Sequence, residues 1–273
     1  MPTTTPVWDP HQYLRHAGHR GRAFVDLLAR VPELPGGPAP RIADLGCGAG
    51  NVTALLAERW PTARITGYDA SPAMLDRART LAGPTAGGGH LDFAPADAGE
   101  WAPDPADPPA LLISNALLHW VPGHTERFAD WTAGLVPGGT FAFQVPGNFD
   151  APSHVLLREL ADSPRWRARL DGVLRHEGAV HTPAAYLDVL TRLGCAVDAW
   201  ETTYAQVLTG EDPVLDWVAG TTLRPVLTAL DADPTALDAF LDEYRTALRR
   251  AYPPAGYGTV FPFRRIFVVA RTA

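Results

Sequence analysis

The chain has 273 residues, 46% apolar and 19% charged, which is enough for a substantial hydrophobic core and excludes global disorder. The net charge of −7 argues against binding nucleic acid by neutralising phosphates, and no apolar run is long enough to cross a membrane. All 23 basic residues are arginines, which excludes Schiff-base and P-loop lysine chemistry.

Cysteine usage and the first residues indicate a compartment. Cys47 and Cys195 are too few for a disulfide framework, and the opening residues MPTTTPVWDP show no charged stretch followed by an apolar run. We therefore expect a cytoplasmic protein without a secretory signal. We expect it to be a monomer or a weak homo-oligomer.

Short apolar runs alternate with helical patterns in the first half of the chain. A first helical pattern places Phe24, Leu27 and Leu28 on one side. The runs expected to be strands are Arg41–Leu45, Arg64–Asp69, Leu91–Ala94, Ala110–Asn115 and Thr140–Val145. The helical patterns are Asn51–Trp60, Pro72–Leu81 and Thr125–Leu135. This alternation predicts a doubly wound, mostly parallel α/β sheet.

After Gly147 the pattern becomes mainly helical. The expected elements are helical stretches at His154–Arg175 and Pro183–Leu193, a strand at Ala196–Val207, a helical stretch at Glu211–Tyr252 broken at Pro225 and Pro234, and a strand at Arg265–Arg271. Gly194 is expected to end the second of these helices, because glycine is favoured just past a helix end. The architecture is therefore a seven-stranded sheet with an inserted helical cap.

A glycine-rich loop follows the first strand. The segment Asp44-Leu45-Gly46-Cys47-Gly48-Ala49-Gly50-Asn51 has the spacing G-x-G-x-G, unlike the dinucleotide spacing G-x-G-x-x-G. Glycines at a strand-to-helix turn adopt positive φ and let a ligand approach the backbone, and the helix N-terminus attracts a negative group. We interpret the loop as a nucleotide-like binding site, with a purely structural turn as the alternative.

Two acidic residues follow the next strands. Asp69 ends the second predicted strand, where a carboxylate can accept hydrogen bonds from ribose hydroxyls; the alternative is a helix N-cap, a role for which Ser71 is better suited. Asp97 follows the third strand, where it can meet an adenine amino group, or can be an exposed turn residue. Both positions lie at the carboxyl ends of strands.

These motifs resemble the class I S-adenosylmethionine-dependent methyltransferases, whose pattern covers about residues 40–146 in DLGCGAG, ITGYDAS and APADAGEW. Nearly end to end, the chain resembles the trans-aconitate 2-methyltransferase family. The further matching segments include Trp8-Asp9-Pro10, Leu118-His119-Trp120, Asp216-Trp217-Val218, Leu223-Arg224-Pro225 and Arg265-Ile266-Phe267. The resemblance implies a Rossmann-like methyltransferase fold.

The resemblance also implies a set of S-adenosylmethionine-binding residues. Asp44 and the loop would hold the methionine part, Asp69 the ribose, Asp97 with Ala98 the adenine, and Asn115 would lie beside the sulfonium. Tyr13 and Arg20 resemble a lid over the cofactor carboxylate, with a mobile arm as the alternative. The full implied set is Tyr13, Arg20, Asp44, Gly46, Cys47, Gly48, Gly50, Asp69, Ala70, Met74, Asp97, Ala98 and Asn115. Met74 is equally a core candidate, and Cys47 is expected to act through shape.

A polycarboxylate substrate requires cations, which here must be arginines, and arginine also binds carboxylates in a bidentate manner. Arg224 and Arg265 are the candidates, with surface ion pairs as the alternative and with Arg264 competing with its neighbour. His119 and Trp120 are expected to position the substrate rather than transfer protons, or to pack structurally. Weaker pocket candidates, each also a core or rim candidate, are Asn148, Tyr204 and Trp217.

The expected reaction is methyl transfer to a carboxylate of a small polycarboxylic acid, with trans-aconitate as the first choice. Such an acceptor is already ionised at neutral pH, so no general base is needed. We find no metal-ligand motif and expect no nucleic-acid or membrane partner. The alternatives are a methyltransferase for another acid or an amine, a nicotinamide-dependent oxidoreductase, and a non-catalytic cofactor-binding protein.

The expected domain organisation follows from these assignments. It comprises an N-terminal lid at residues 1–35, a cofactor-binding core at 36–148, a helical cap over the substrate site at 149–182 and 209–260, and remaining core elements at 183–208 and 261–273. The cap is thus expected to be inserted twice into one sheet-based domain.

Overall fold

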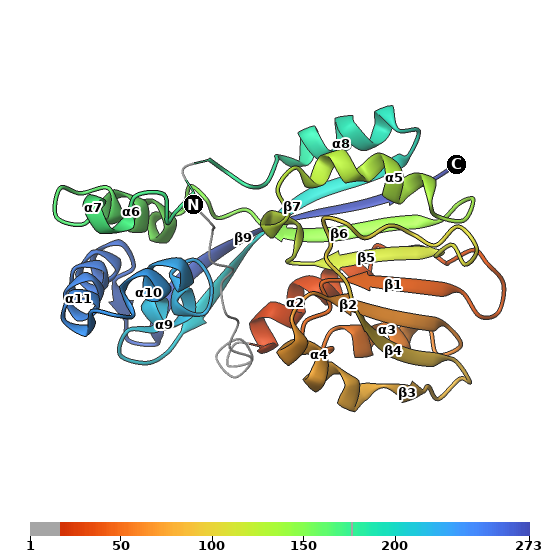
Figure 1. The fold of residues 1–273 in the computed structure, drawn as a ribbon, viewed down its shortest axis with the longest axis horizontal. Helices are drawn as coiled ribbons and strands as arrows, with labels where there is room; N and C mark the ends of the chain where they lie inside the picture. Colours follow the sequence, from red (N-terminus) through yellow and green to blue (C-terminus); the bar gives the residue numbers. More distant parts are fainter. Residues whose placement is uncertain (1–16, 176) are drawn as a thin grey trace. The chain divides into compact units, whose positions relative to one another are not determined.

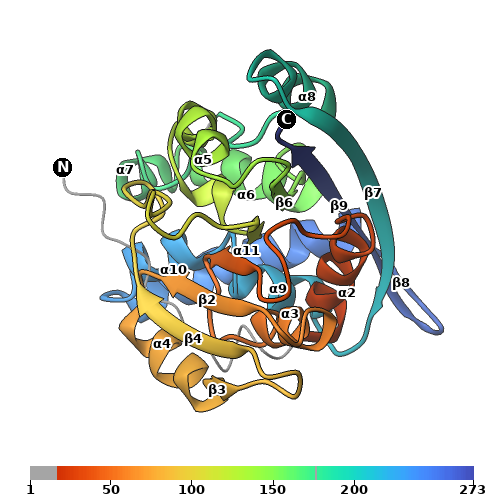
Figure 2. The same ribbon diagram turned by 90° about the vertical axis from the view of Figure 1, so that its right-hand side faces the viewer.

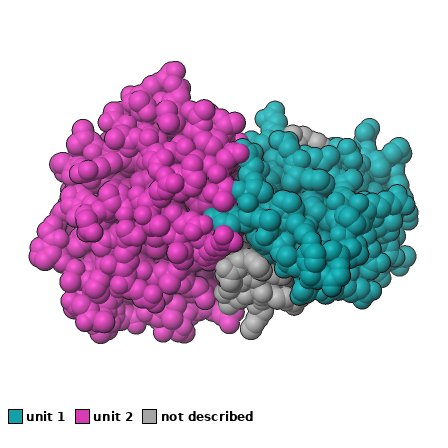
Figure 3. All heavy atoms as spheres, turned by 180° about the vertical axis from the view of Figure 1, so that it is seen from behind, with its two compact units in different colours: residues 1–17, 147–178, 203–264 teal, residues 18–146, 179–202, 265–273 magenta. Residues whose placement is uncertain are grey.

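The computed structural model describes residues 17–175 and 177–273. The chain folds into two compact units, which Figure 3 colours separately. We call residues 18–146, 179–202 and 265–273 the core unit, and residues 147–178 and 203–264 the helical unit.

A mixed sheet organises the chain (Figure 1). The strand order is β3-β4-β2-β1-β5-β6-β9-β7, and β8 pairs with β9. The strand bounds are β1 Arg41–Leu45, β2 Arg64–Asp69, β3 Gly83–Pro84, β4 His90–Pro95, β5 Leu111–Asn115, β6 Thr140–Pro146, β7 Ala196–Leu208, β8 Pro254–Ala255 and β9 Gly258–Arg271. This confirms the predicted α/β class. The described residues form nine strands instead of the expected seven, because β3 and β8 are additional two-residue pairings.

The parallel part of the sheet reverses its order between β1 and β5. Strand β1 pairs in parallel with both β2 and β5, β2 with β4, and β5 with β6, whereas β9 runs antiparallel to β6. Nearly every residue of β5 and β6 is buried, as strands covered on both faces require. In such sheets, ligands bind outside the carboxyl ends of the strands at the point of reversal. The topology therefore predicts a ligand site at the carboxyl ends of β1 and its neighbours.

In the core unit, helices cover both faces of the sheet (Figure 2). Their bounds are α2 Ala17–Leu28, α3 Thr53–Arg59, α4 Pro72–Ala78, α5 Phe128–Ala133 and α8 Pro183–Arg192. Phe128 of α5 and Tyr186 of α8 pack with Phe141 and Phe143 of β6 in one buried aromatic cluster. Gly194 lies just beyond α8 with φ +85°, as its predicted place at a helix end requires.

The helical unit has its own core. It contains α6 Pro152–Ala161, α7 Arg167–Leu170, α9 Pro213–Ala219, α10 Arg224–Leu230 and α11 Pro234–Ala251. Their buried faces surround a cluster that includes Trp217, Phe240 and Phe261. The stretch His154–Arg175, expected as one helical region, is divided into α6 and α7, and Pro164 lies between them, where proline cannot continue a helix.

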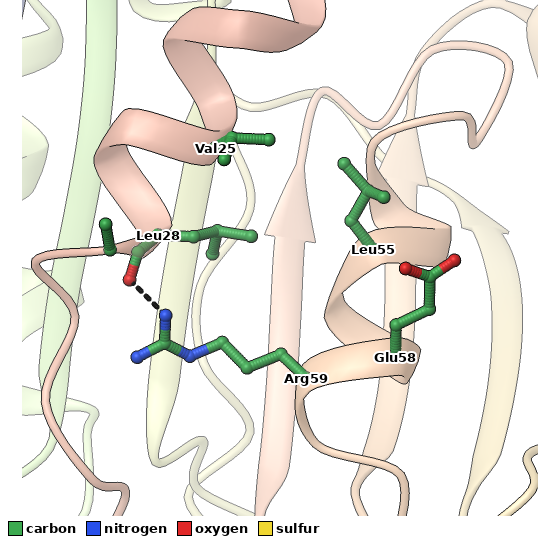
Figure 4. Close-up of a pocket in the computed structure, with 6 residues that line it drawn as sticks. Val25, Leu28, Leu55, Glu58 and Arg59 are labelled. Atoms are coloured by element: carbon green, nitrogen blue, oxygen red, sulfur yellow. Dashed lines mark hydrogen bonds between the residues drawn. The ribbon is translucent and has the colours of Figure 1, made fainter.

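One surface groove of the core unit lies away from the predicted site residues (Figure 4). It is lined by Val25 and Leu28 of α2 and by Leu55, Glu58 and Arg59 of α3. The Arg59 guanidinium donates hydrogen bonds to the carbonyl oxygens of Leu28 and Val31, so it satisfies the carboxyl end of α2. The Arg59 side chain of this groove therefore has a structural role at the end of α2.

Candidate active site

The glycine loop connects β1 to α3, and its three glycines all have positive φ. A Cβ atom at Gly46 would lie 2.7 Å from Leu117 Cβ, and one at Gly50 would lie 2.9 Å from the Phe93 ring, so both positions need glycine for packing. A Cβ at Gly48, where φ is +56°, would meet nothing within 4 Å. The middle of the loop thus faces open space that a ligand can occupy.

Asp44 lies beneath this loop and is fully buried. Its Oδ2 accepts a hydrogen bond from Thr53 Oγ1 at 2.7 Å, while its buried Oδ1 has no hydrogen-bond partner among the described residues. Burial raises the pKa of Asp44 to about 7, the Thr53 hydrogen bond opposes this shift, and the charge of Asp69 adds to it. Because an unpaired buried carboxylate is costly, this site fits a cationic hydrogen-bond donor such as an ammonium group.

Asp69 ends β2 and connects two backbone segments. Its Oδ2 accepts from the Gly48 N–H at 2.9 Å, and its Oδ1 accepts from the Ser71 N–H at 2.8 Å. Ser71 is the N-cap of α4, since its Oγ accepts from the Met74 N–H. The alternative role of Asp69 as the cap is therefore wrong, and its half-buried carboxylate is held beside the glycine loop.

The next strand end supplies Asp97 and Ala98. Asp69 of β2 pairs in register with Pro95 of β4, so the two acidic segments follow neighbouring strands. Asp97 is exposed and accepts from the Gly99 N–H at 2.7 Å, which makes it a turn residue whose carboxylate also faces solvent. Ala98 and Met74 are buried, whereas Ala70 is exposed. Both acidic segments therefore lie at the carboxyl edge of the sheet.

A row of polar side chains continues this edge across three strands. Asn115 ends β5 and pairs in register with Gln144 of β6. Gln144 Nε2 donates a hydrogen bond to Asn115 Oδ1, and the buried Arg265 of β9 donates from Nη1 to Gln144 Oε1 at 3.1 Å. The candidate cofactor residue Asn115 and the candidate substrate residue Arg265 are thus linked through Gln144.

The chain turns sharply after β5. Ala116 has φ +56°, a left-handed conformation that is uncommon for residues other than glycine, and its N–H donates to the Gln144 carbonyl oxygen. The short 3₁₀ helix Leu118–Trp120 follows and places the half-buried rings of His119 and Trp120 with their centroids 4.9 Å apart. Strained backbone of this kind is concentrated at functional sites.

The remaining substrate candidates lie in the helical unit. The Asn148 side chain is buried and forms two hydrogen bonds with the Arg264 backbone, donating to its carbonyl oxygen at 3.2 Å and accepting from its N–H at 2.8 Å. Trp217 is buried against Phe261 and Phe263 in the core of this unit. These contacts give Asn148 and Trp217 structural roles.

Tyr204 and Arg224 are the other two substrate candidates of the helical unit. Tyr204 is buried in β7, and Arg224 is half-buried at the first residue of α10. Tyr13 lies outside the described residues, and so does the side chain of Arg20. Arg264 donates from Nη1 to the Gly147 carbonyl oxygen, whereas Arg265 is the one that reaches Gln144.

Cys47 lies in the loop as a buried free thiol. Burial raises its pKa, and the nearby carboxylates of Asp44 and Asp69 raise it further, so the thiol stays protonated at neutral pH. In the described part of the chain, no group of His, Cys, Asp or Glu side chains is arranged to hold a metal ion. Over the same residues, no helix has the length and apolar character needed to span a bilayer.

Three residues at this edge were not predicted from the sequence. Thr53 binds Asp44, Gln144 links Asn115 to Arg265, and Ala116 makes the turn after β5. Gln144 could have been noticed as the single amide within the apolar run Thr140–Val145. The other two have no local pattern that distinguishes them.

Comparisons with known proteins agree with this geometry. Residues 42–139 match a family described as "Methyltransferase domain". The trans-aconitate 2-methyltransferase of Streptomyces coelicolor is 69% identical, covering 99% of this chain and 88% of that protein, and the one of Rhodococcus jostii is 48% identical, covering 97% and 99%. The YcgJ protein of Bacillus subtilis has a similar fold, with a TM-score of 0.53 at 14% identity, covering 93% of this chain and 98% of that one. The chain therefore belongs to the trans-aconitate 2-methyltransferase family.

Proposed function

We propose that this chain transfers a methyl group from S-adenosylmethionine to a carboxylate of trans-aconitate, yielding a monomethyl ester and S-adenosylhomocysteine. The observation that supports this most directly is the 69% identity, over 99% of the chain, to an enzyme with that substrate in its name. The chain is a methyltransferase that uses S-adenosylmethionine, and the carboxyl edge of the core unit is where we place the cofactor.

The residues at this edge fit the cofactor. The unpartnered Oδ1 of Asp44 suits its ammonium group, and the open space at Gly48 leaves room for its backbone approach. The carboxylate of Asp69, already oriented by two backbone N–H groups, would accept from the ribose hydroxyls, and Asp97 with Ala98 would contact the adenine. When bound, the cofactor supplies a methyl group made electrophilic by the sulfonium.

The protein's own contribution to the reaction is positioning. A carboxylate acceptor is ionised at neutral pH, so the chain need not remove a proton from it. We propose that Arg224 binds a carboxylate of the acid, that Arg265 contributes to carboxylate binding through its contact with Gln144, and that His119 and Trp120 orient the acid and exclude water. Tyr204, Trp217 and Asn148 remain weaker candidates, since the last two have structural contacts of their own.

The two cysteines bear on the compartment in which the reaction takes place. Cys47 and Cys195 are both free and buried, which fits a reducing compartment, and we propose the cytoplasm. We propose that the enzyme is a monomer or a weak homo-oligomer. Sedimentation at several protein concentrations tests the last point, since a stable dimer at all of them would contradict it.

A labelling experiment tests the reaction itself. The purified protein is incubated with methyl-labelled S-adenosylmethionine and a panel of di- and tricarboxylic acids, with a primary amine panel as the control. We expect label in trans-aconitate that is released by mild base, as an ester requires. Base-stable label, or label only in amines, would contradict carboxylate methylation.

A further inference from the structure

Hydrogen-bond chemistry fixes the orientation of two side-chain amides at the carboxyl edge. A guanidinium group can only donate, so the Gln144 atom that faces Arg265 Nη1 must be the amide oxygen. The other end of the same amide, Nε2, then faces Asn115 and must donate to Oδ1. The oxygen of Asn115 is thereby occupied, and its Nδ2 donor is turned away from Gln144.

We propose that Arg265 and Gln144 are positioning residues that present Asn115 Nδ2 as a hydrogen-bond donor to a carboxylate oxygen bound at this edge. This inference rests on the proposed function and refines it. Two carboxylates can provide that oxygen: one on the acid substrate, and one on the methionine part of the cofactor. The donor chemistry is the same for both, and affinity measurements distinguish them.

The side-chain arrangement supports this assignment. Phe143, Val145 and Ile266 face the apolar cluster under α5 and α8, so by strand alternation Gln144 and Arg265 lie on the opposite face. Gln144 is 1% exposed and Arg265 is 5% exposed, whereas Asn115 is half-buried at the strand end. The inner two groups are thus shielded from competing water, and only the last amide is at the edge.

Polarisation along the row of hydrogen bonds also makes Asn115 Nδ2 a better donor. A positive charge that donates to the Gln144 oxygen strengthens the Nε2 donor, which in turn strengthens the Nδ2 donor of Asn115. A strengthened donor stabilises a carboxylate oxygen. A methyl-accepting amine instead needs neighbouring groups that accept its N–H protons, and a donor cannot do this. The row therefore favours carboxylate over amine acceptors at this position.

The test compares Gln144→Glu with Gln144→Leu. The glutamate keeps a contact with Arg265 but has no donor, so Asn115 must turn its Nδ2 toward residue 144 and its oxygen toward the ligand. The leucine only releases the Asn115 amide. We expect Gln144→Glu to lose about tenfold or more in carboxylate recognition, as expected for one hydrogen bond to a charged group, and Gln144→Leu to lose less.

The two affinities identify the ligand. A Kd for S-adenosylhomocysteine that rises in Gln144→Glu assigns the donor to the cofactor carboxylate. A KM for trans-aconitate that rises while this Kd is constant assigns it to the acid, and calorimetric binding of the acid to the S-adenosylhomocysteine complex checks this without turnover. Asn115→Asp, which removes the donor directly, should show the same pattern.

Thermal unfolding separates this role from a structural one. Gln144→Glu forms an ion pair with Arg265 and should unfold at a higher temperature than Gln144→Leu, although it binds carboxylate less well. A purely structural role would rank the two variants in the same order for stability and for binding. The inference is overturned if folded Gln144→Glu matches the wild type in both affinities. Inactivity of the wild type toward every acid would instead contradict the proposed function.

Discussion

The carboxyl edge of the core unit and the interior of the helical unit use their polar side chains differently. At the edge, Asp44 and Asp69 are held by short-range contacts to Thr53, Gly48 and Ser71, and each retains capacity to accept from a ligand. The candidate acidic residues at this edge therefore differ from Asn148 of the helical unit, whose amide is bonded at both ends.

In the helical unit, Asn148 and Tyr244 are polar side chains whose hydrogen bonds lie within the unit. Asn148 is bonded at both ends of its amide to the Arg264 backbone, and the hydroxyl of Tyr244 donates to the Ser153 carbonyl oxygen at 2.6 Å. The burial of Tyr244 also raises its pKa. Such groups stabilise the fold and have little capacity for a substrate, which leaves Arg224 as the main candidate there.

Substitution of Gly46 should destabilise the protein more than any other change considered, and Gly48 in the same loop is its matched control. Gly46→Ala combines a left-handed backbone with a Cβ 2.7 Å from Leu117 Cβ, so we expect a loss of about 3 kcal/mol of unfolding free energy. Gly48→Ala has only the backbone cost, about 1 kcal/mol, but should weaken cofactor binding. Urea unfolding and calorimetry measure the two. Equal stability losses would remove the distinction between packing and ligand-facing glycines.

A second expectation concerns Asn148. Asn148→Ala removes two hydrogen bonds to the Arg264 backbone in a buried position, so unfolding free energy should fall by about 2 kcal/mol. The KM for trans-aconitate should stay unchanged wherever the variant is folded. A raised KM without loss of stability would instead assign Asn148 to the substrate site.

The sequence predicts the core unit well because local patterns determine it. The strands β1, β2, β4, β5 and β6 coincide with the expected apolar runs to within one residue at each end. Strand β9 begins at Gly258, seven residues before the expected start at Arg265, because its first half alternates between buried and exposed positions and contains Pro262. An alternating strand with a proline has no continuous apolar run to indicate it.

The positions of the candidate residues were predictable where motif and topology coincide. Asp44, Gly48 and Asp69 follow from spacing, because strand ends bring them to one edge. The role of Gln144 was not predictable, because it depends on Arg265, which lies 121 residues later in the chain. A contact of that sequence separation depends on the register of β6 with β9, which no local pattern fixes.

Asp69→Ala tests the edge at the ribose position. The substitution removes the acceptor held by the Gly48 and Ser71 N–H groups, so the Kd for S-adenosylhomocysteine should rise by about tenfold or more. Calorimetry measures it directly. Asp97→Ala, at the exposed turn, should have a smaller effect. Unchanged affinity in Asp69→Ala would exclude this carboxylate from the site.

Arg224→Ala tests the helical unit. Loss of one cation for a polycarboxylate should raise the KM for trans-aconitate by about tenfold while leaving the Kd for S-adenosylhomocysteine unchanged. Arg169→Ala, which removes an exposed ion pair with Asp233 in the same unit, is the matched control and should leave both unchanged. If the control and Arg224→Ala behave alike, Arg224 does not bind the substrate.

The smallest effect is expected from pH, through Asp44. Its pKa of about 7 in the folded protein, against 3.8 without burial, means that it is largely protonated below pH 7. A protonated carboxyl cannot pair with the cofactor's ammonium group, so affinity for S-adenosylhomocysteine should rise by up to about tenfold between pH 6 and pH 8. Calorimetry across that range measures the slope.

Stability should change in the opposite direction over the same range. The raised pKa of Asp44 stabilises the free protein fully below about pH 4, and that contribution is lost as pH rises through 7, where the buried group must ionise. Asp44→Asn removes the titration, so it should flatten both profiles, weaken binding at pH 8 and leave the free protein there at least as stable as the wild type. A pH-independent affinity in the wild type would mean that Asp44 is already ionised in the ligand-free protein. The cost of burying its charge would then be compensated before any ligand binds.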